Sequence, residues 1–306
     1  MMIGSATDPL AQVIEILRPQ AVFSKGISGA GAWAVEYSEF GRPAFAAMTL
    51  GSCRLTIAGQ EPVILAAGDF VLLPASPRFA MSSLDPGPLR RIDARADPPR
   101  HEVRHGRQDG PPDMRQFGGW FTFAAPDADL MVALLPRMIH LRGLPRLTQL
   151  VHMLGEEAAR EAAGRDLILT RLVEILLIEA LRAAPTETTA PGLLRGLSDP
   201  RISAALRSLH GDITRAWTVP ELAGVAGMSR SAFFERFTRW VGIRPIEYLT
   251  TWRMAVARDL LRRGSFALEE VADRVGYSSA STFSTAFSRH TGKSPGRFMK
   301  AALVGA

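Results

Sequence analysis

Short apolar runs separated by turn residues occupy the chain from about residue 20 to residue 90. The segments RPAFAAMTL, SCRLTIAG, EPVILAAG and DFVLLPASP are each bounded or broken by Gly, Pro or Asp. This is the pattern of closely spaced strands joined by tight turns, and it predicts a sandwich or a small barrel. Residues from about 91 to 116 are rich in Arg, Asp, Pro and Gly and predict a long loop, after which GGWFTFAA returns to the strand pattern.

The period of the apolar residues changes from two to helical after about residue 143. Residues 144–163 and 165–184 both predict amphipathic helices, because apolar residues recur on one face of each. The stripe of the first helix is Leu147, Leu150, Val151 and Leu154, and that of the second is Leu169, Leu172, Val173, Leu176, Leu177 and Leu181. Such stripes need an apolar partner, which is either the β-rich region or a second subunit.

The stretch APTETTAPG, beginning at Ala184, predicts a hinge, and everything beyond it has a helical pattern. The order of elements therefore predicts an α+β protein of two domains: a β-barrel followed by helices, then an all-α region. The boundaries expected are a β-rich domain at 1–143, a helical segment at 144–184, a linker at 185–198 and an all-α domain at 199–306. A chain of 306 residues is long enough for two such domains.

Residues 218–245 and 267–295 are two copies of one pattern. Ala223, Gly227 and Ser229 recur 49 residues later as Ala272, Gly276 and Ser278, and Phe233, Phe237, Gly242 and Pro245 recur 50 residues later as Phe283, Phe287, Gly292 and Pro295. Each copy predicts a short helix, a glycine with positive φ, a serine that caps the next helix, and a second helix that buries two phenylalanines. This arrangement is a helix-turn-helix unit, and EYLTTWRMAVARDLLRRG between the copies predicts one continuous connecting helix.

Positive charge is concentrated in the same part of the chain. Residues 199–306 contain 16 Lys and Arg against 9 Asp and Glu, whereas the first 198 residues contain 20 against 21. A basic segment beside a neutral one indicates a module that binds a polyanion. The second copy also carries many Ser and Thr between its phenylalanines. These are mediocre helix formers, but their short polar side chains suit the major groove of DNA.

The C-terminal motifs resemble those of the AraC/XylS family of bacterial transcription regulators. The resemblance covers about 100 residues, through WTVPELAGVAGMSRSAFFERFTRWVG, YLTTWRMAVARDLLRRG and EEVADRVGYSSASTFSTAFSRHTGKSPGRFMK. It implies a regulator whose two helix-turn-helix units enter successive major-groove faces of one asymmetric double-stranded DNA site. The residues expected to face DNA are Arg230, Ser231, Phe234 and Glu235 in the first copy and Ala280, Ser281, Thr282 and Thr285 in the second, with Arg236, Arg253, Arg289 and Lys293 as candidates for phosphate contacts.

The β-rich front resembles the cupin-type sensor domain that precedes such DNA-binding domains. The segment LTIAGQEPVILAAGDFVLLPASPRFAM carries this resemblance, with Gly68, Asp69 and Pro74 at the turn positions. Positions where related sequences often carry metal-binding residues hold Ala46, Ala47, Arg78 and Phe117 instead. His101 and His105 fall in a polar loop without a converging Cys or carboxylate, so we expect no metal and no cofactor.

An apolar barrel interior suits a small organic effector, which the resemblance also implies. Candidate lining residues are Trp33, Tyr37, Phe45, Met48, Phe70 and Arg78, with Arg78 the partner of an anionic effector. The sole cysteine, Cys53, is expected to be a buried small hydrophobe rather than a redox sensor. Two alternatives stay open: a DNA-binding regulator that needs no effector, and a cupin metalloenzyme fused to a DNA-binding domain.

The sequence also predicts where the protein works and with what. It has no apolar run long enough to span a membrane, no secretory signal pattern and one cysteine, so we expect a cytoplasmic protein without membrane contact. The family resemblance implies a homodimer formed through the leucine stripes and contact with RNA polymerase. We expect a non-enzymatic regulator and assign it the role of activator, although the sequence does not distinguish activation from repression.

Overall fold

The structure is a computed structural model that describes residues 8–39, 41–93, 102–123, 132, 135–184, 191–264 and 266–304. The described chain divides into two compact units. The β-rich unit comprises residues 18–126 and 136–188, and the helical unit comprises the remainder, including residues up to Leu17 at the N-terminus. The first described helix thus packs within the helical unit, whereas the expected β-rich domain included it; the domain boundaries stay a prediction.

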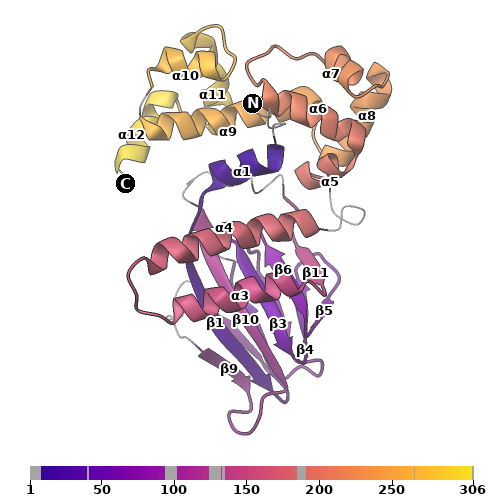
Figure 1. The fold of residues 1–306 in the computed structure, drawn as a ribbon, viewed down its shortest axis with the longest axis vertical. Coiled ribbons are helices and arrows are strands. Elements are labelled where there is room, and N and C mark those ends of the chain that lie inside the picture. Colours follow the sequence, from indigo (N-terminus) through magenta and orange to yellow (C-terminus); the bar gives the residue numbers. More distant parts are fainter. Residues whose placement is uncertain are drawn as a thin grey trace, which may run out of the picture. The chain divides into compact units, whose positions relative to one another are not determined.

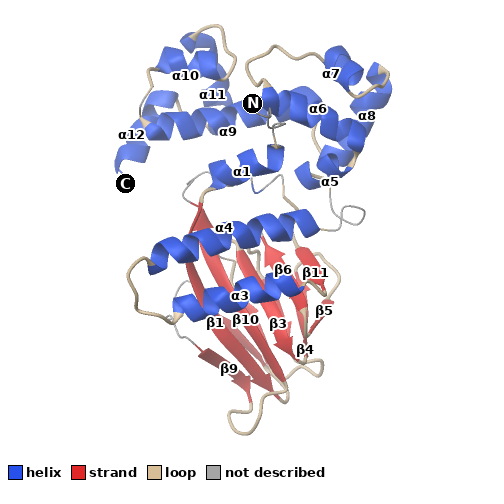
Figure 2. Ribbon diagram, in the orientation of Figure 1, coloured by secondary structure: helices blue, strands red, loops and turns tan. Residues whose placement is uncertain are grey.

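The β-rich unit is built from two sheets (Figures 1 and 2). The six-stranded sheet has the order β11 (Ile139–Arg142), β6 (Asp69–Leu73), β3 (Ala44–Leu50), β10 (Met114–Phe123), β1 (Pro19–Ala30) and β9 (Glu102–Gly106). The five-stranded sheet has the order β5 (Val63–Ala66), β4 (Ser52–Ile57), β7 (Phe79–Ser82), β2 (Ala34–Tyr37) and β8 (Leu89–Ile92). Neighbouring strands are antiparallel, except that β9 runs parallel to β1 and β8 parallel to β2. The predicted barrel is thus a pair of separate sheets among the described strands.

The predicted long loop at 91–116 contains a strand. Residues Glu102–Gly106 form β9, which pairs with Gly26–Ala30 of β1 at the edge of the six-stranded sheet. An edge strand has one free side and tolerates polar residues, so its Arg and Glu content concealed it.

The core between the sheets is a single cluster of buried side chains. Its buried members are Trp33, Val35, Tyr37, Ala46, Met48, Cys53, Leu55, Ile57, Leu65, Val71, Leu73, Met81 and Met114. Successive residues of a strand point to opposite faces. Ala46 and Met48 of β3 therefore enter this cluster, while Phe45 and Ala47 lie on the other face of the same sheet.

Helices α3 (Pro145–Ala158) and α4 (Arg165–Ala183) cover that other face, packing on β1, β3 and β10 (Figure 1). Every residue of both predicted apolar stripes is buried there. The ring of Phe117 on β10 meets the ring of His152 on α3 edge-on at 5.0 Å. The stripes thus pack within one chain, and the prediction that they pair between subunits is wrong because the sheet already buries them.

The helical unit contains α1 (Pro9–Leu17), α5 (Leu193–Ser198), α6 (Pro200–Gly211), α7 (Val219–Val225), α8 (Arg230–Val241), α9 (Pro245–Arg263), α10 (Leu268–Arg274), α11 (Ala280–Thr291) and α12 (Pro295–Val304). Helix α5 lies inside the predicted linker, and it packs on α6 and α8 with Leu193 and Leu194 buried. The Pro/Thr-rich sequence around it predicted a linker, but these two adjacent leucines supply the apolar contact that holds the helix. Among the described helices, none is long and apolar enough to cross a bilayer.

The internal repeat folds as predicted, with one change of register. Gly227 and Gly276 both have positive φ, at 61° and 77°, in the turns that follow α7 and α10. Ser229 caps α8 by accepting a hydrogen bond from the Ala232 amide. The cap of α11 is Ser279 rather than the predicted Ser278, because the extra residue of the second copy lies in the turn before the cap. The predicted connector is the single helix α9.

Candidate nucleic-acid interface

The two recognition helices, α8 and α11, are each held by two buried phenylalanines. Phe233 and Phe237 are fully buried with ring centroids 5.5 Å apart, and Phe283 and Phe287 repeat this at 5.5 Å. Residues four apart lie on one helix face, so the opposite face of each helix is left to solvent. This fixes which side chains of each helix are available to a partner.

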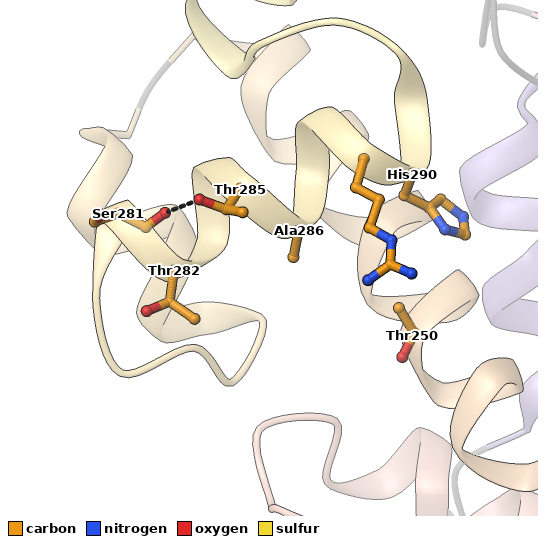
Figure 3. Close-up of a pocket in the computed structure, with 7 residues that line it drawn as sticks. Thr250, Ser281, Thr282, Thr285, Ala286 and His290 are labelled. Carbon is orange, nitrogen blue, oxygen red and sulfur yellow. Dashed lines mark hydrogen bonds between the residues drawn. The ribbon is translucent and has the colours of Figure 1, made fainter.

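Helix α11 borders a groove with a volume of about 670 Å³ (Figure 3). The groove is lined by Thr250, Ser281, Thr282, Thr285, Ala286, Arg289 and His290. Four of these, Ser281, Thr282, Thr285 and Arg289, belong to the residues predicted to face DNA, and all four are exposed. The predicted Ala280 is half-buried at the first position of the helix, and Lys293 is exposed beyond its end.

The hydroxyl groups of α11 are partly engaged in bonds within the helix. Thr285 donates its hydroxyl hydrogen to the carbonyl oxygen of Ser281 at 3.1 Å (Figure 3). The hydroxyl of Thr282 lies 2.9 Å from that of the capping Ser279. Because the Thr285 hydrogen is used, its oxygen offers acceptor lone pairs to a base edge, while its methyl group suits a thymine methyl.

Helix α8 presents a different chemistry. The predicted residues Arg230, Ser231, Phe234 and Glu235 are all exposed. Phe234 is 37% exposed, so it is directed away from the core that its neighbour Phe233 enters. The face therefore carries two opposite charges and an aromatic ring, whereas α11 carries mainly small hydroxyls.

Arg236 forms an ion pair with a buried carboxylate of the same chain, that of Asp199. Its Nε donates to Asp199 Oδ2 at 2.8 Å, and Asp199 in turn accepts hydrogen bonds from the Arg201 and Ile202 amides at the start of α6. Burial would raise the pKa of Asp199, but the hydrogen bonds from Arg236 and these amides hold it below its ordinary value. This ion pair joins α8 to α6, and the phosphate contact of Arg236 stays a prediction.

Arg253 is likewise occupied within the protein. Its guanidinium donates to the carbonyl oxygens of Ile213, Thr214 and Arg215, at 2.8, 3.2 and 2.8 Å. The same group lies 5.8 Å from the ring centroid of Tyr277, in the turn before α11. These contacts favour a structural role for Arg253 over the predicted phosphate contact, and they leave Arg289 and Lys293 as the exposed phosphate candidates.

Sequence reasoning missed three residues of the groove: Thr250, Ala286 and His290. Ala286 and His290 follow Thr282 at helical spacing on α11, so the face could have been extended to them. Thr250 comes from α9, and only the tertiary structure brings it beside α11. Burial, and then the nearby Arg258, lowers the pKa of His290, which favours its neutral form.

A buried polar network joins α1 to the first helix-turn-helix unit. His210 on α6 has its Nδ1 2.8 Å from Gln12 Oε1 on α1 and its Nε2 2.8 Å from the Tyr248 hydroxyl on α9. Its ring also lies 4.3 Å from that of Trp252. Burial lowers the pKa of His210 to about 3, so the ring is neutral at physiological pH. Nothing in the sequence pattern pointed to this network, because its members are up to 198 residues apart.

The predicted lining residues of the β-rich unit do not share one surface. Trp33, Tyr37 and Met48 lie in the cluster between the sheets. Phe45 and Phe70 are buried, but on the strand faces that α3 and α4 cover. Arg78 is exposed. Period-two alternation explains the split, since Phe45 and Met48 are an odd number of residues apart on β3.

The residues considered for metal chemistry are dispersed. His105 lies on β9 rather than in the predicted polar loop, and its buried ring stacks on Trp33 with centroids 5.4 Å apart. His101 is outside the described residues. Across the described ranges, no three His, Cys, Asp or Glu side chains gather as a metal site. Cys53 is fully buried, and burial raises the pKa of its thiol to about 12, so it remains a neutral thiol.

Comparisons with known proteins agree with this division of the chain. The cupin family matches residues 8–184 and the helix-turn-helix domain family matches residues 222–301. An AraC-like transcription regulator of Streptomyces antibioticus is 35% identical over 305 residues, covering 96% of this chain and 98% of the relative. One from Streptomyces lividans is 34% identical over 302 residues, with 96% and 98% covered.

Among solved structures, the chain has a similarity to ToxT from Vibrio cholerae O395. It is 14% identical, with a TM-score of 0.39, and the match covers 94% of this chain and 98% of ToxT.

Proposed function

The chain belongs to the AraC-like family of transcription regulators, with a cupin domain ahead of its helix-turn-helix region, and we propose that its two recognition helices read one asymmetric DNA site together. The protein is a DNA-binding regulator of transcription. The observation that carries the proposal is the pair of recognition helices, α8 and α11, held by equivalent phenylalanines 50 residues apart and joined through α9.

We assign base reading to the exposed side chains in the N-terminal half of each recognition helix. In α8 these are Arg230, Ser231, Phe234 and Glu235, and in α11 they are Ser281, Thr282 and Thr285, with Ala280 at the helix start. Arg230 suits guanine in the major groove, while Ser and Thr read several bases. Arg289 and Lys293 contact phosphate, which sets register on the duplex rather than sequence.

The test compares Thr285→Ala with Arg289→Ala in the full chain. Sequences that each variant binds are selected from random duplexes, and affinities are measured from 50 to 200 mM salt. Thr285→Ala should change preference at one base position by about 1–3 kcal/mol, whereas Arg289→Ala should weaken all duplexes alike and reduce the salt slope by about 1. Ser284→Ala is the control, since Ser284 is half-buried on α11 and does not line the groove. An unchanged preference in Thr285→Ala contradicts this placement of α11.

The β-rich unit serves, in this proposal, as a sensor for a small organic effector. The cupin match and the apolar cluster between two sheets support this role. Effector binding would bias the placement of the recognition helices and so change promoter occupancy. Limited proteolysis and DNA affinity with and without a bound effector test it, and identical DNA affinity under both conditions would favour a regulator that needs no effector.

We propose that the protein is not an enzyme. The relatives are named transcription regulators, and the described residues bring no metal-binding group together. Elemental analysis of the purified full chain tests the metalloenzyme alternative. Stoichiometric iron or zinc would revive that alternative, because cupin chemistry depends on the metal.

A cytoplasmic homodimer that contacts RNA polymerase is the remaining part of the proposal. The inward stripes of α3 and α4 are occupied, so a dimer contact involving α4 would use its exposed apolar residues Leu167, Ile168 and Ile175. Sedimentation of the full chain and of Ile175→Arg measures this. An unchanged dimer in Ile175→Arg would remove α4 from the interface, and a monomeric wild type would overturn the dimer.

A further inference from the structure

Gln116 is a buried amide side chain in the interior of the β-rich unit. It lies on β10, is 3% exposed, and pairs with Met48 on β3 and Ile27 on β1. Paired residues of neighbouring strands point to the same face of a sheet, and Met48 belongs to the cluster between the sheets. The Gln116 Nε2 lies 3.6 Å from the sulfur of Met81 on β7, in the opposite sheet. The side chain therefore projects into the interior.

Within the part of the chain that the structure describes, no group donates a hydrogen bond to the carbonyl oxygen of Gln116. An amide oxygen removed from water without a donor destabilises the folded state, and a leucine of similar size would fit an apolar core without that cost. Its amide nitrogen faces only a thioether, which is a weak acceptor. The amide is thus poorly satisfied by the protein itself, and its oxygen is free to accept a hydrogen bond from a molecule between the sheets.

The surroundings of Gln116 are rich in sulfur. Met48, Met81 and Met114 are all buried in the same cluster, and the thiol of Cys53 lies 3.7 Å from the Met48 sulfur. Methionine is unbranched and flexible, so its side chain can change rotamer to accommodate a guest of irregular shape. The interior can therefore adapt around a ligand in a way that a core of β-branched residues cannot.

The charge of the interior restricts which ligand it accepts. Among the described residues of the β-rich unit, no Lys or Arg is buried, and the predicted anion partner Arg78 is exposed. A carboxylate placed between the sheets would lose its hydration without gaining a counter-charge from these residues, which is strongly unfavourable. A neutral molecule avoids this penalty.

We propose that Gln116 anchors the effector, and that the effector is a neutral, largely apolar molecule that donates one N–H or O–H to the Gln116 carbonyl oxygen. The three methionines rearrange to enclose its apolar part. This inference rests on the proposed sensor function of the β-rich unit and specifies the chemical class that the unit recognises.

The test uses the full chain and probes matched in shape: indole, which is neutral with an N–H donor, 1-benzothiophene, which lacks the donor, and indole-3-carboxylate, which is an anion. Calorimetry measures each dissociation constant. We expect indole to bind about threefold to tenfold more tightly than benzothiophene, the difference that one neutral hydrogen bond makes, and the carboxylate to bind more weakly than either. Phenol and 1-naphthol extend the neutral donor series to other sizes.

The variant Gln116→Leu should abolish the preference for indole while binding benzothiophene at least as well as the wild type does. Gln116→Met serves the same purpose if leucine impairs folding, and Gln60→Leu, at a half-buried position in the turn after β4, is the control outside the cluster. Preference for indole that survives in both Gln116 variants overturns the inference. Tight binding of the carboxylate, or no binding of any neutral donor probe, overturns it as well, and both outcomes leave the sensor function to the separate measurement of DNA affinity with and without an effector.

Discussion

The two helix-turn-helix units have the same aromatic framework and different surroundings. In the first, Phe233 and Phe237 have an interplanar angle of 55°, and in the second Phe283 and Phe287 have one of 53°. A third ring completes each set edge-on, from Tyr248 at 6.0 Å in the first and from Phe298 at 5.5 Å in the second. The two units thus share three aromatic positions, which form the frame of each, and the second adds Tyr277, whose ring lies edge-on to that of Phe283 at 5.7 Å.

What surrounds each frame differs. The Tyr248 hydroxyl connects the first frame to His210 and, through it, to α1, and the Arg236–Asp199 pair connects it to α6. Phe298 has no hydroxyl, and the guanidinium groups of Arg258 and Arg262 lie 5.9 and 5.8 Å from its ring. The two units therefore keep the same three aromatic positions while they differ in their contacts with neighbouring helices and in the side chains that the recognition helix exposes.

The largest effect should come from removing one ring of either frame. Phe237→Ala and Phe287→Ala should each destabilise their own unit by about 3–5 kcal/mol, because each deletes a fully buried ring and leaves a cavity. Hydrogen exchange of α7–α8 and α10–α11 peptides in the full chain measures the two separately. Loss of protection spread equally over both units would show that the frames are not independent.

The next effect concerns the equivalent glycines. Gly227→Ala should cost about 1–2 kcal/mol, since φ is 61° but a Cβ there meets nothing within 4 Å. Gly276→Ala should cost more, because φ is 77° and the Cβ would lie 2.5 Å from the Thr214 carbonyl oxygen and 2.6 Å from Arg253 Nη2. Urea unfolding of the two full-length variants gives the comparison, and equal costs would contradict the crowding at Gly276.

Acid should destabilise the first unit through His210. The folded pKa of about 3 lies below the unfolded value of about 6.5, so the unfolded chain takes up the proton first as pH falls. The stability that the folded protein gains from keeping His210 neutral is fully present above about pH 6.5 and is lost as pH falls towards 3. Between pH 7 and pH 5 the free energy of unfolding should fall by about 2 kcal/mol for this reason. Plots of unfolding free energy against pH for the wild type and His210→Gln should differ in slope across this range. Parallel plots would show that His210 is not the source of the acid sensitivity.

The smallest effect distinguishes the two serines before α11. Ser279→Ala should destabilise the second unit by about 1 kcal/mol, because its hydroxyl accepts from the Thr282 amide at 3.2 Å. The neighbouring Ser278→Ala should change stability by less than about 0.5 kcal/mol, as for an ordinary exposed site. A larger loss at Ser278 would return the cap to the register that the repeat alone suggested.

The sequence predicted the helices of the two units well because period, glycine turns and caps are local signals. It placed the exposed faces of α8 and α11 correctly, since two phenylalanines four residues apart define the buried side. It missed β9, because an edge strand tolerates polar residues. It also missed α5, because its two adjacent leucines stand in a Pro-rich stretch. It did not reveal the intramolecular acceptors of Arg236 and Arg253, because these lie 37 to 40 residues away and only the fold brings them near.

Arg253 joins the loop before α7 to the turn before α11, and this has a consequence for the promoters the protein can occupy. We expect these contacts, together with the continuous helix α9, to hold the two units at one angle relative to each other. Inserting five base pairs between the two halves of an operator rotates one half by about half a turn of the duplex, where a turn is about 10–10.5 base pairs. Such operators should lose one half of their contacts outright, whereas a chain with freely pivoting units would tolerate them.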